Sequence, residues 1–196
     1  MVLFLTAYTL DRADKFMWVG PLGVNKYSLI RSRISKNPSP TLEEAKHLKI
    51  GTYANDVREK ILIDIGFSPS NFTRLHGLNA NTVNLTMLLS GRIELWATSL
   101  STAKKVYVEM QKDCPVPSLC NRLEFLDAED IFEPILDLQS HYLYAAFSMG
   151  TNPEIVKQWQ KTLEQMKQDG TYEKIIMKDK NGKEYLTFDN PFKINN

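Results

Sequence analysis

The chain has 196 residues, with 24 Lys and Arg against 23 Asp and Glu, so its formal net charge is +1. A composition of 43% hydrophobic and 24% charged residues is that of a globular protein with a sizeable core, and it excludes a disordered or fibrous chain. The balanced charge excludes capture of a polyanion by a basic field, so we expect no nucleic-acid partner. No apolar run approaches the roughly 20 residues that cross a bilayer. The opening Met1-Val-Leu-Phe-Leu lacks the basic start and the apolar length of a signal peptide.

Short apolar runs bounded by turn residues predict strands along the chain. They span 2–8, 27–34, 48–52, 72–75, 93–97, 123–126 and 142–147. The segment 16–23 ends in Gly-Pro-Leu-Gly, which predicts loop residues at its end. Helical patterns fall between the later strands, so the sequence predicts an α/β protein with a mostly parallel sheet.

Capping residues predict where the helices begin and end. The residues expected at N-caps are Thr41, Asn55 or Asp56, Ser99 or Ser101, and Asn152. Thr41 with Glu44 fits a capping box, and a short acidic helix is expected near Glu129. Pro153 occupies the first turn of the last long helix, and Gly170 ends it.

Several segments, in this order, resemble motifs of one protein family. Thr9-Leu-Asp-Arg12 followed by Phe16-Met-Trp-Val-Gly-Pro is similar to T-x-x-R … F-S-x-P-Y, and the run 42–52 is similar to L-x-x-L-K-G-K-x-V-G-V. The run 88–97 resembles L-x-x-G-R-x-D-A-x-x-x-D, and Tyr144-Ala-Ala-Phe-Ser-Met-Gly with Asp169-Gly-Thr-Tyr-Glu-Lys-Ile resembles Y-x-x-A-F-x-K-G … D-G-T-Y-x-K-I. These are motifs of the family 3 extracellular solute-binding proteins, the polar amino-acid receptors of ABC importers.

The resemblance implies a type II periplasmic-binding-protein-like fold with a complete lobe II and a partial lobe I. Residues 1–26 would be a remnant of lobe I with the first crossover, 27–142 lobe II, and 143–196 the second crossover with the C-terminal helices of lobe I. The family's first lobe begins with two further βα units, so we expect Ile155, Trp159 and Leu163 to leave an apolar stripe uncovered. Three explanations stay open: a start placed too late, a partner or swapped copy, or a remnant protein.

The resemblance also implies a ligand site with Arg12 as the anchor of a ligand carboxylate, and with Thr6, Ala7 and Tyr8 beside it. A fixed guanidinium suits this role because it binds a carboxylate through two parallel hydrogen bonds. The alternative for Arg12 is a surface arginine paired with Asp11 or Asp14. The alternative for Tyr8 is core or edge packing.

From lobe II, the resemblance places Tyr53, Asn55, Asp56, Thr98 and Ser99 at the ligand. Asn55 and Asp56 are also ordinary helix caps, and Asp56 brings a negative charge to a position where a carboxylate would approach. Ser99 stands where the family has the Asp that binds a ligand ammonium. Since a hydroxyl cannot offer an ammonium the attraction of a carboxylate, an ordinary α-amino acid is in doubt as the ligand.

Cys114 and Cys120 form a loop-closing disulfide or remain two separate thiols, and they fall short of the four ligands of a zinc site. The sequence has no G-x-S-x-G, H-E-x-x-H or Gly-rich phosphate loop. We therefore expect no catalysis, no metal and no cofactor.

The resemblance thus predicts a periplasmic solute-binding protein that holds a small polar solute, an amino acid or related carboxylate, and serves an ABC transporter permease or a sensor. The periplasmic location follows from the resemblance alone, because this chain shows no signal peptide. The alternative is a ligand-sensing or interaction module, outside transport, that dimerises through its C-terminal helices as a homodimer or swapped dimer.

Overall fold

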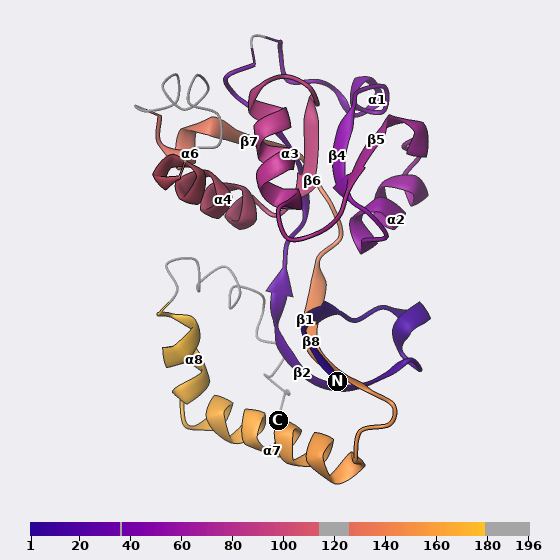
Figure 1. The fold of residues 1–196 in the computed structure, drawn as a ribbon, viewed down its shortest axis with the longest axis vertical. Helices are drawn as coiled ribbons and strands as arrows, with labels where there is room; N and C mark the ends of the chain where they lie inside the picture. The colour runs from indigo at the N-terminus through magenta and orange to yellow at the C-terminus, as the bar shows by residue number, and fades with distance from the viewer. Residues whose placement is uncertain (36, 114–125, 179–196) are drawn as a thin grey trace. The chain divides into compact units, whose positions relative to one another are not determined.

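The computed structural model describes residues 1–35, 37–113 and 126–178 (Figure 1). Both cysteines and most of the predicted strand 123–126 lie outside these ranges. The chain divides into two compact units: unit 1 comprises Met1–Asn25 and Ser140–Asn196, and unit 2 comprises Lys26–Gln139. Among the described residues, no helix is long and apolar enough to span a membrane.

Unit 2 contains a five-stranded sheet flanked by helices. Its elements are β3 (Ser28–Ser32), α1 (Leu42–Ala45), β4 (Ile50–Tyr53), α2 (Val57–Asp64), the 3-10 turn η2 (Pro69–Asn71), β5 (Phe72–Leu75), α3 (Ala80–Leu89), β6 (Leu95–Thr98), α4 (Leu100–Lys112), α6 (Ala128–Ile131) and β7 (Phe132–Asp137). The strand order is β5-β4-β6-β3-β7.

The prediction of a mostly parallel sheet is wrong. β4 pairs parallel with β5 and β6, but β3 pairs antiparallel with β6 and with β7. The reason is that only β4, β5 and β6 belong to the βα repeat. The chain enters the unit along β3 and leaves along β7, a strand that the sequence patterns did not reveal, so these two strands run in opposite directions.

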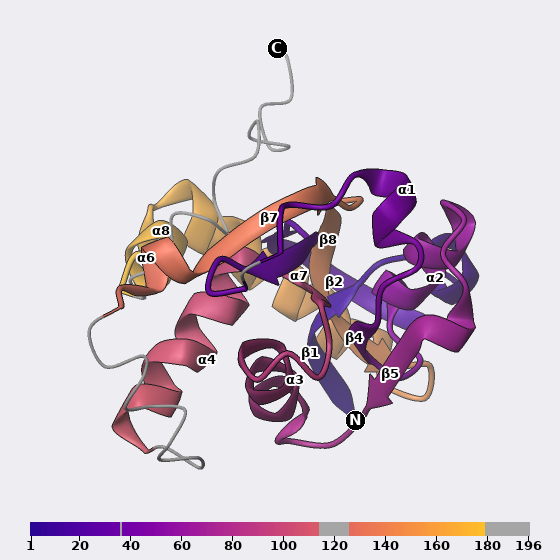
Figure 2. The ribbon, with the colours of Figure 1, turned by 90° about the horizontal axis from the view of Figure 1, so that it is seen from above.

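The βα repeat puts helices on both faces of this sheet. β5 lies on one side of β4 and β6 on the other, so the crossovers through α2 and α3 run in opposite directions along the sheet. Because parallel crossovers are right-handed, α2 and α3 cover opposite faces, as can be followed in Figure 2.

A large core lies between the sheet and the helices α3 and α4. Ile30 and Trp96, neighbours on β3 and β6, are 0% and 1% exposed at its centre. The other buried members are Leu85, Leu88, Leu89, Ile93, Ala103, Val106, Tyr107, Met110, Ile131 and Phe132. Two elements were predicted with accurate caps: Thr41 and Glu44 form the reciprocal hydrogen bonds of a capping box, and Ser99 caps α4.

Unit 1 is built on a three-stranded antiparallel sheet. Its elements are β1 (Val2–Ala7), the 3-10 turn η1 (Leu10–Arg12), β2 (Phe16–Asn25), β8 (His141–Ser148), α7 (Pro153–Gln168) and α8 (Thr171–Ile176). The strand order is β1-β8-β2. α7 begins at the predicted Asn152 cap with Pro153 in its first turn.

The prediction of loop residues at the end of the segment 16–23 is also wrong, because the whole segment belongs to β2. Their pairing with β8 shifts register between Val19 and Gly23. In that gap, side chains of α7 and α8 take the place of the missing ladder bonds. Gln160 bonds both backbone groups of Gly20, at 2.9 and 3.3 Å, and Lys167 Nζ donates to the Pro21 carbonyl at 2.6 Å. Sequence patterns do not report such distant partners.

The predicted apolar stripe on α7 is covered in part. Leu163 is only 6% exposed and packs with Val19, Ala145 and Phe147 of the sheet, so the expectation was wrong for this residue. Ile155 and Trp159 remain 45% exposed.

Candidate functional site

The candidate residues of unit 1 lie where β1 ends. The Tyr8 N–H donates to the Tyr142 carbonyl at 3.2 Å, so the pairing with β8 continues past Ala7, which is buried. The Thr6 hydroxyl donates back to the Leu3 carbonyl at 3.4 Å. Thr6 therefore bonds within its own strand and Ala7 is buried, whereas the side chain of Tyr8 is partly exposed to solvent.

Tyr8 belongs to an aromatic cluster, in agreement with the alternative of edge packing given for this residue above. Its ring lies 5.1 Å from that of Trp18 and 5.5 Å from that of Tyr144. The Trp18 indole also contacts Phe16 at 5.5 Å and donates to the Ala13 carbonyl at 3.1 Å. Because side chains alternate along β2, Phe16 and Trp18 face away from α7. The cluster thus forms a half-exposed aromatic surface next to the turn that carries Arg12.

Arg12 is the last residue of η1 and is half-exposed. Its backbone closes the turn through bonds to Thr9 and from Lys15, each 3.0 Å long. Within the described ranges its guanidinium makes no hydrogen bond and no ion pair at contact distance. The pKa of the neighbouring Asp11 carboxyl is lowered, mainly by a hydrogen bond from Thr9 and in part by the charge of Arg12. An unpaired guanidinium keeps all its donors for a carboxylate from solution.

The candidate residues of unit 2 come together at one edge of the five-stranded sheet. β4 and β6 are parallel neighbours, so their carboxyl ends meet. Tyr53 ends β4 and is followed by Asn55 and Asp56, and Thr98 ends β6 and is followed by Ser99. These five residues are thus adjacent within unit 2.

Asp56 is the N-cap of α2 and is already neutralised. Its Oδ1 accepts from the Arg58 backbone N–H at 3.0 Å and from Arg58 Nε at 2.5 Å. The same guanidinium donates to the Ala97 carbonyl at 3.2 Å and lies over the Tyr27 ring. The expected unfavourable charge of Asp56 is therefore compensated by Arg58, a residue that the sequence analysis missed. The Asp-x-Arg spacing at a helix start was the available signal.

Asn55 does not cap the helix. Its φ is +60°, in the left-handed region that Asn tolerates better than most residues because its short polar side chain can bond locally. This conformation turns the chain between β4 and α2 and leaves the Asn55 side chain exposed.

The Ser99 hydroxyl forms hydrogen bonds with the first turn of α4. Its Oγ accepts from the Thr102 N–H at 3.2 Å, contacts Ser101 Oγ at 3.2 Å and donates to Thr102 Oγ1 at 2.7 Å. The neighbouring Thr98 is fully buried, and its hydroxyl has no hydrogen-bond partner among the described residues. The last residue of β6 and the cap that follows it are therefore buried hydroxyl residues rather than carboxylates.

A buried polar network lies beneath the turn after β4. Glu59 of α2 accepts from Thr52 Oγ1 at 2.5 Å and from Arg74 Nε at 3.0 Å. These bonds join β4, α2 and β5, so they hold the β4–α2 turn in place. In the part of the chain that the structure describes, no group of three or more His, Cys, Asp or Glu side chains could hold a metal ion.

Solved structures share this fold. A histidine kinase sensor domain with similarity to periplasmic binding proteins superposes with a TM-score of 0.68 at 16% identity, over 90% of this chain and 68% of that one. An ancestral arginine-binding protein bound to glutamine gives 0.64 at 21%, over 88% and 67%. The periplasmic binding protein of an arginine transport system from Legionella pneumophila gives 0.63 at 14%, over 90% and 71%.

These similarities confirm the predicted fold class: the chain has a periplasmic-binding-protein-like α/β fold and spans about two thirds of those proteins' length. No family model and no curated protein matches the sequence.

Proposed function

We propose that the chain is a solute-binding protein of the periplasm that binds a small carboxylate, an amino acid or a related compound, for an ABC transporter. The fold similarity to amino-acid-binding proteins of transporters supports the class. The observation that carries the proposal is the unpaired, half-exposed guanidinium of Arg12 beside a half-exposed aromatic surface.

Arg12 supplies the anchor. A guanidinium stays charged at all physiological pH values and matches the two oxygens of a carboxylate in a fork. The rings of Tyr8 and Trp18 offer an apolar wall next to this cation. Thr6 and Ala7 contribute backbone groups at the end of β1.

Unit 2 carries its own set of candidate ligand residues at the carboxyl ends of β4 and β6. Asn55 is exposed on the turn after β4 and Tyr53 is half-exposed before it, whereas Thr98 and Ser99 are buried at the adjacent end of β6. Because Arg58 neutralises Asp56, the turn does not repel an anion. With no free carboxylate at Ser99, the residues favour a carboxylate without an α-ammonium over an ordinary amino acid.

The permease of an ABC transporter recognises the ligand-bound protein. Recognition by a sensor protein is the second candidate, and the similarity to a histidine kinase sensor domain favours it. We infer binding rather than catalysis, in keeping with the amino-acid-binding proteins to which the fold is similar. The chain can be used to capture its partner from a membrane extract. Recovery of a transporter permease supports the first candidate, and recovery of a sensor kinase supports the second.

A thermal-shift screen tests the proposal. The purified chain is heated with a panel of amino acids and of the same acids without their amino group. We expect a rise in the melting temperature for at least one carboxylate, because a ligand that binds only the folded state stabilises it. Arg12→Ala removes that rise, whereas Arg33→Ala, an exposed arginine of unit 2, keeps it. A rise that Arg12→Ala leaves unchanged contradicts the anchor, and a panel without any rise contradicts the function.

A further inference from the structure

Four aromatic rings form one layer on the sheet of unit 1. Trp18 lies at its centre, with ring centroids 5.1 Å from Tyr8, 5.5 Å from Phe16 and 5.9 Å from Tyr144. Because Trp18 pairs with Ala146 of β8 and side chains alternate along a strand, Tyr144 lies on the same face as Trp18. Tyr8 is 38% exposed and the other three rings are partly exposed, so the layer is open to solvent.

This aromatic cluster is joined to the turn that carries Arg12. The Trp18 Nε1–H donates to the Ala13 carbonyl at 3.1 Å, and Ala13 directly follows Arg12. Leu10, two residues before Arg12 in the same turn, is 89% exposed. The turn therefore brings a cation next to an apolar ring surface.

The rings of the cluster meet edge to face. The Trp18 ring makes angles of 69°, 70° and 80° with the rings of Tyr8, Phe16 and Tyr144. The glycine at position 20 leaves room for Tyr144, because an added Cβ there would lie 2.5 Å from the Cδ1 atom of this ring. Such angles are favourable because the electron-rich face of one ring attracts the edge of another. A further aromatic ring from solution can extend this arrangement, whereas a saturated ring of the same size gains only the burial of its surface.

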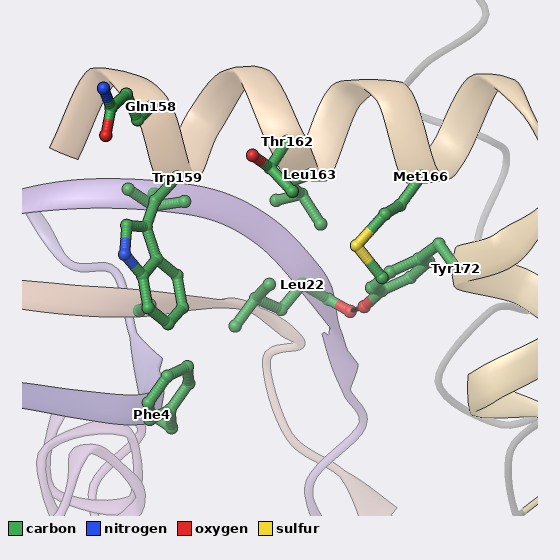
Figure 3. A pocket seen from close by; sticks show the side chains of 10 residues that line it. Phe4, Leu22, Gln158, Trp159, Thr162, Leu163, Met166 and Tyr172 are labelled. Atoms are coloured by element: carbon green, nitrogen blue, oxygen red, sulfur yellow. Dashed lines mark hydrogen bonds between the residues drawn. The ribbon is translucent and has the colours of Figure 1, made fainter. Parts of the chain in front are cut away.

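The opposite face of the sheet offers no comparable place for a carboxylate. Val19, the neighbour of Trp18 in β2, lines a groove of about 430 Å³ on that face, and Figure 3 shows Trp159, Leu163 and Met166 extending from α7 toward it. Ten described residues line this groove beneath α7, and none of these ten carries a charge. An ionised carboxylate in an apolar site without a cation is strongly unfavourable, so the groove does not suit the proposed solute.

We propose that the solute is an aromatic carboxylate, an inference that rests on the proposed function. The Arg12 guanidinium binds the carboxylate through two parallel hydrogen bonds, and the ring of the solute packs on the cluster around Trp18. The proposed function by itself requires only a carboxylate that Arg12 can bind. The cluster narrows the choice, because an acid with an aromatic ring uses the cation and the ring surface together, whereas a short aliphatic acid uses the cation alone.

Isothermal titration calorimetry of the full chain with matched pairs of acids tests this inference at neutral pH. The pairs are benzoate with cyclohexanecarboxylate, phenylacetate with cyclohexylacetate, and phenylpropanoate with cyclohexylpropanoate. Each pair differs in whether the ring is aromatic, and the three pairs differ in the length of the spacer between ring and carboxylate. We expect the aromatic member of at least one pair to bind about tenfold more tightly than its saturated partner.

Variants of two tryptophans show which surface causes this preference. Trp18→Leu reduces the ratio of the two affinities to about twofold or less, whereas Trp18→Phe keeps a ring and retains the preference. A mere disturbance of the turn would weaken both members of a pair equally and leave the ratio unchanged. Trp159→Leu is the matched control, because it makes the same change at a half-exposed tryptophan on the opposite face, and it keeps the tenfold ratio of the wild-type chain.

Several results would overturn the inference and leave the proposed function intact. They are equal binding of both members in every pair, a preference that survives Trp18→Leu, and no binding of any ring acid by a chain that binds an aliphatic carboxylate. A preference lost in Trp159→Leu would place the ring in the groove beneath α7 and overturn the inference as well. A chain that binds no carboxylate at all contradicts the proposed function itself, and the aliphatic acids of the thermal-shift panel separate this failure from the others.

Discussion

Units 1 and 2 bury their sheets to different extents. Unit 2 carries helices on both faces of its five strands, and Ile30, Trp96 and Leu85 at its centre are at most 1% exposed. Unit 1 has one long helix, α7, on one face of three strands, and the core there is limited to Val19, Ala145, Phe147 and Leu163 with its half-buried neighbours.

The difference shows where a partner can act. A unit whose apolar surface is already covered gains little from a second molecule, whereas one with an exposed edge can be stabilised by one. The same unit 1 carries the unpaired Arg12 and the half-exposed aromatic cluster. We therefore expect changes in unit 2 to act mainly on folding, and changes in unit 1 to act mainly on binding.

The largest expected effect is that of Trp96→Ala. Removing a fully buried indole from the core of unit 2 costs about 3–5 kcal/mol of unfolding free energy. Trp159→Ala, the matched change at a half-exposed indole of unit 1, costs less than half of that. Urea unfolding followed by circular dichroism measures both. Equal losses would show that the two units are buried to the same extent after all.

Gly51→Ala is expected to act through crowding in the same unit. An added Cβ would lie 2.3 Å from Asn84 Oδ1 and 2.6 Å from Ile93 Cδ1. Overpacking of this kind costs about 1–3 kcal/mol. The control is Gly150→Ala in unit 1, where an added Cβ meets no atom within 4 Å and where φ is not in the left-handed region. A Gly51→Ala variant as stable as the control would contradict the close packing of β4 against α3.

The smallest effect concerns Lys167 in unit 1. Burial lowers the pKa of this lysine to about 8 from its ordinary 10.5. Between these two values the unfolded chain binds more protons than the folded one, so the free energy of unfolding rises with pH through that window. Lys167→Met lacks this rise. We expect the stability of the wild-type chain relative to the variant to increase between about pH 8 and 10.5. A flat or falling difference would contradict the burial.

Local signals explain what could be predicted from the sequence. The Asn152 cap with Pro153, the capping box at Thr41 and the strand Phe72–Leu75 all depend on neighbouring residues, and the structure confirms them. The errors involve distant partners. β2 was missed because Gln160 and Lys167, more than 100 residues away, bond the backbone at its register shift.

The candidate site divides in the same way. Arg12 and Ser99 could be proposed from their motifs, and Asp56 from its position before a helix. The pairing of Asp56 with Arg58, and of Glu59 with Arg74, depends on rotamers and on the meeting of β4, α2 and β5, which spacing does not determine. The ligand roles themselves stay predictions.

Amide chemical-shift mapping tests the central claim most directly, because it reports each unit without assuming how the two are placed. A carboxylate that raises the melting temperature is titrated into the nitrogen-labelled chain. We expect saturable shifts at Tyr8 and Arg12 in unit 1, and the shifts of Asn55 and Ser99 in unit 2 are followed in the same titration. Shifts confined to the groove beneath α7, or their persistence in Arg12→Ala, would contradict the assignment of this chain as a carboxylate-binding protein anchored by Arg12.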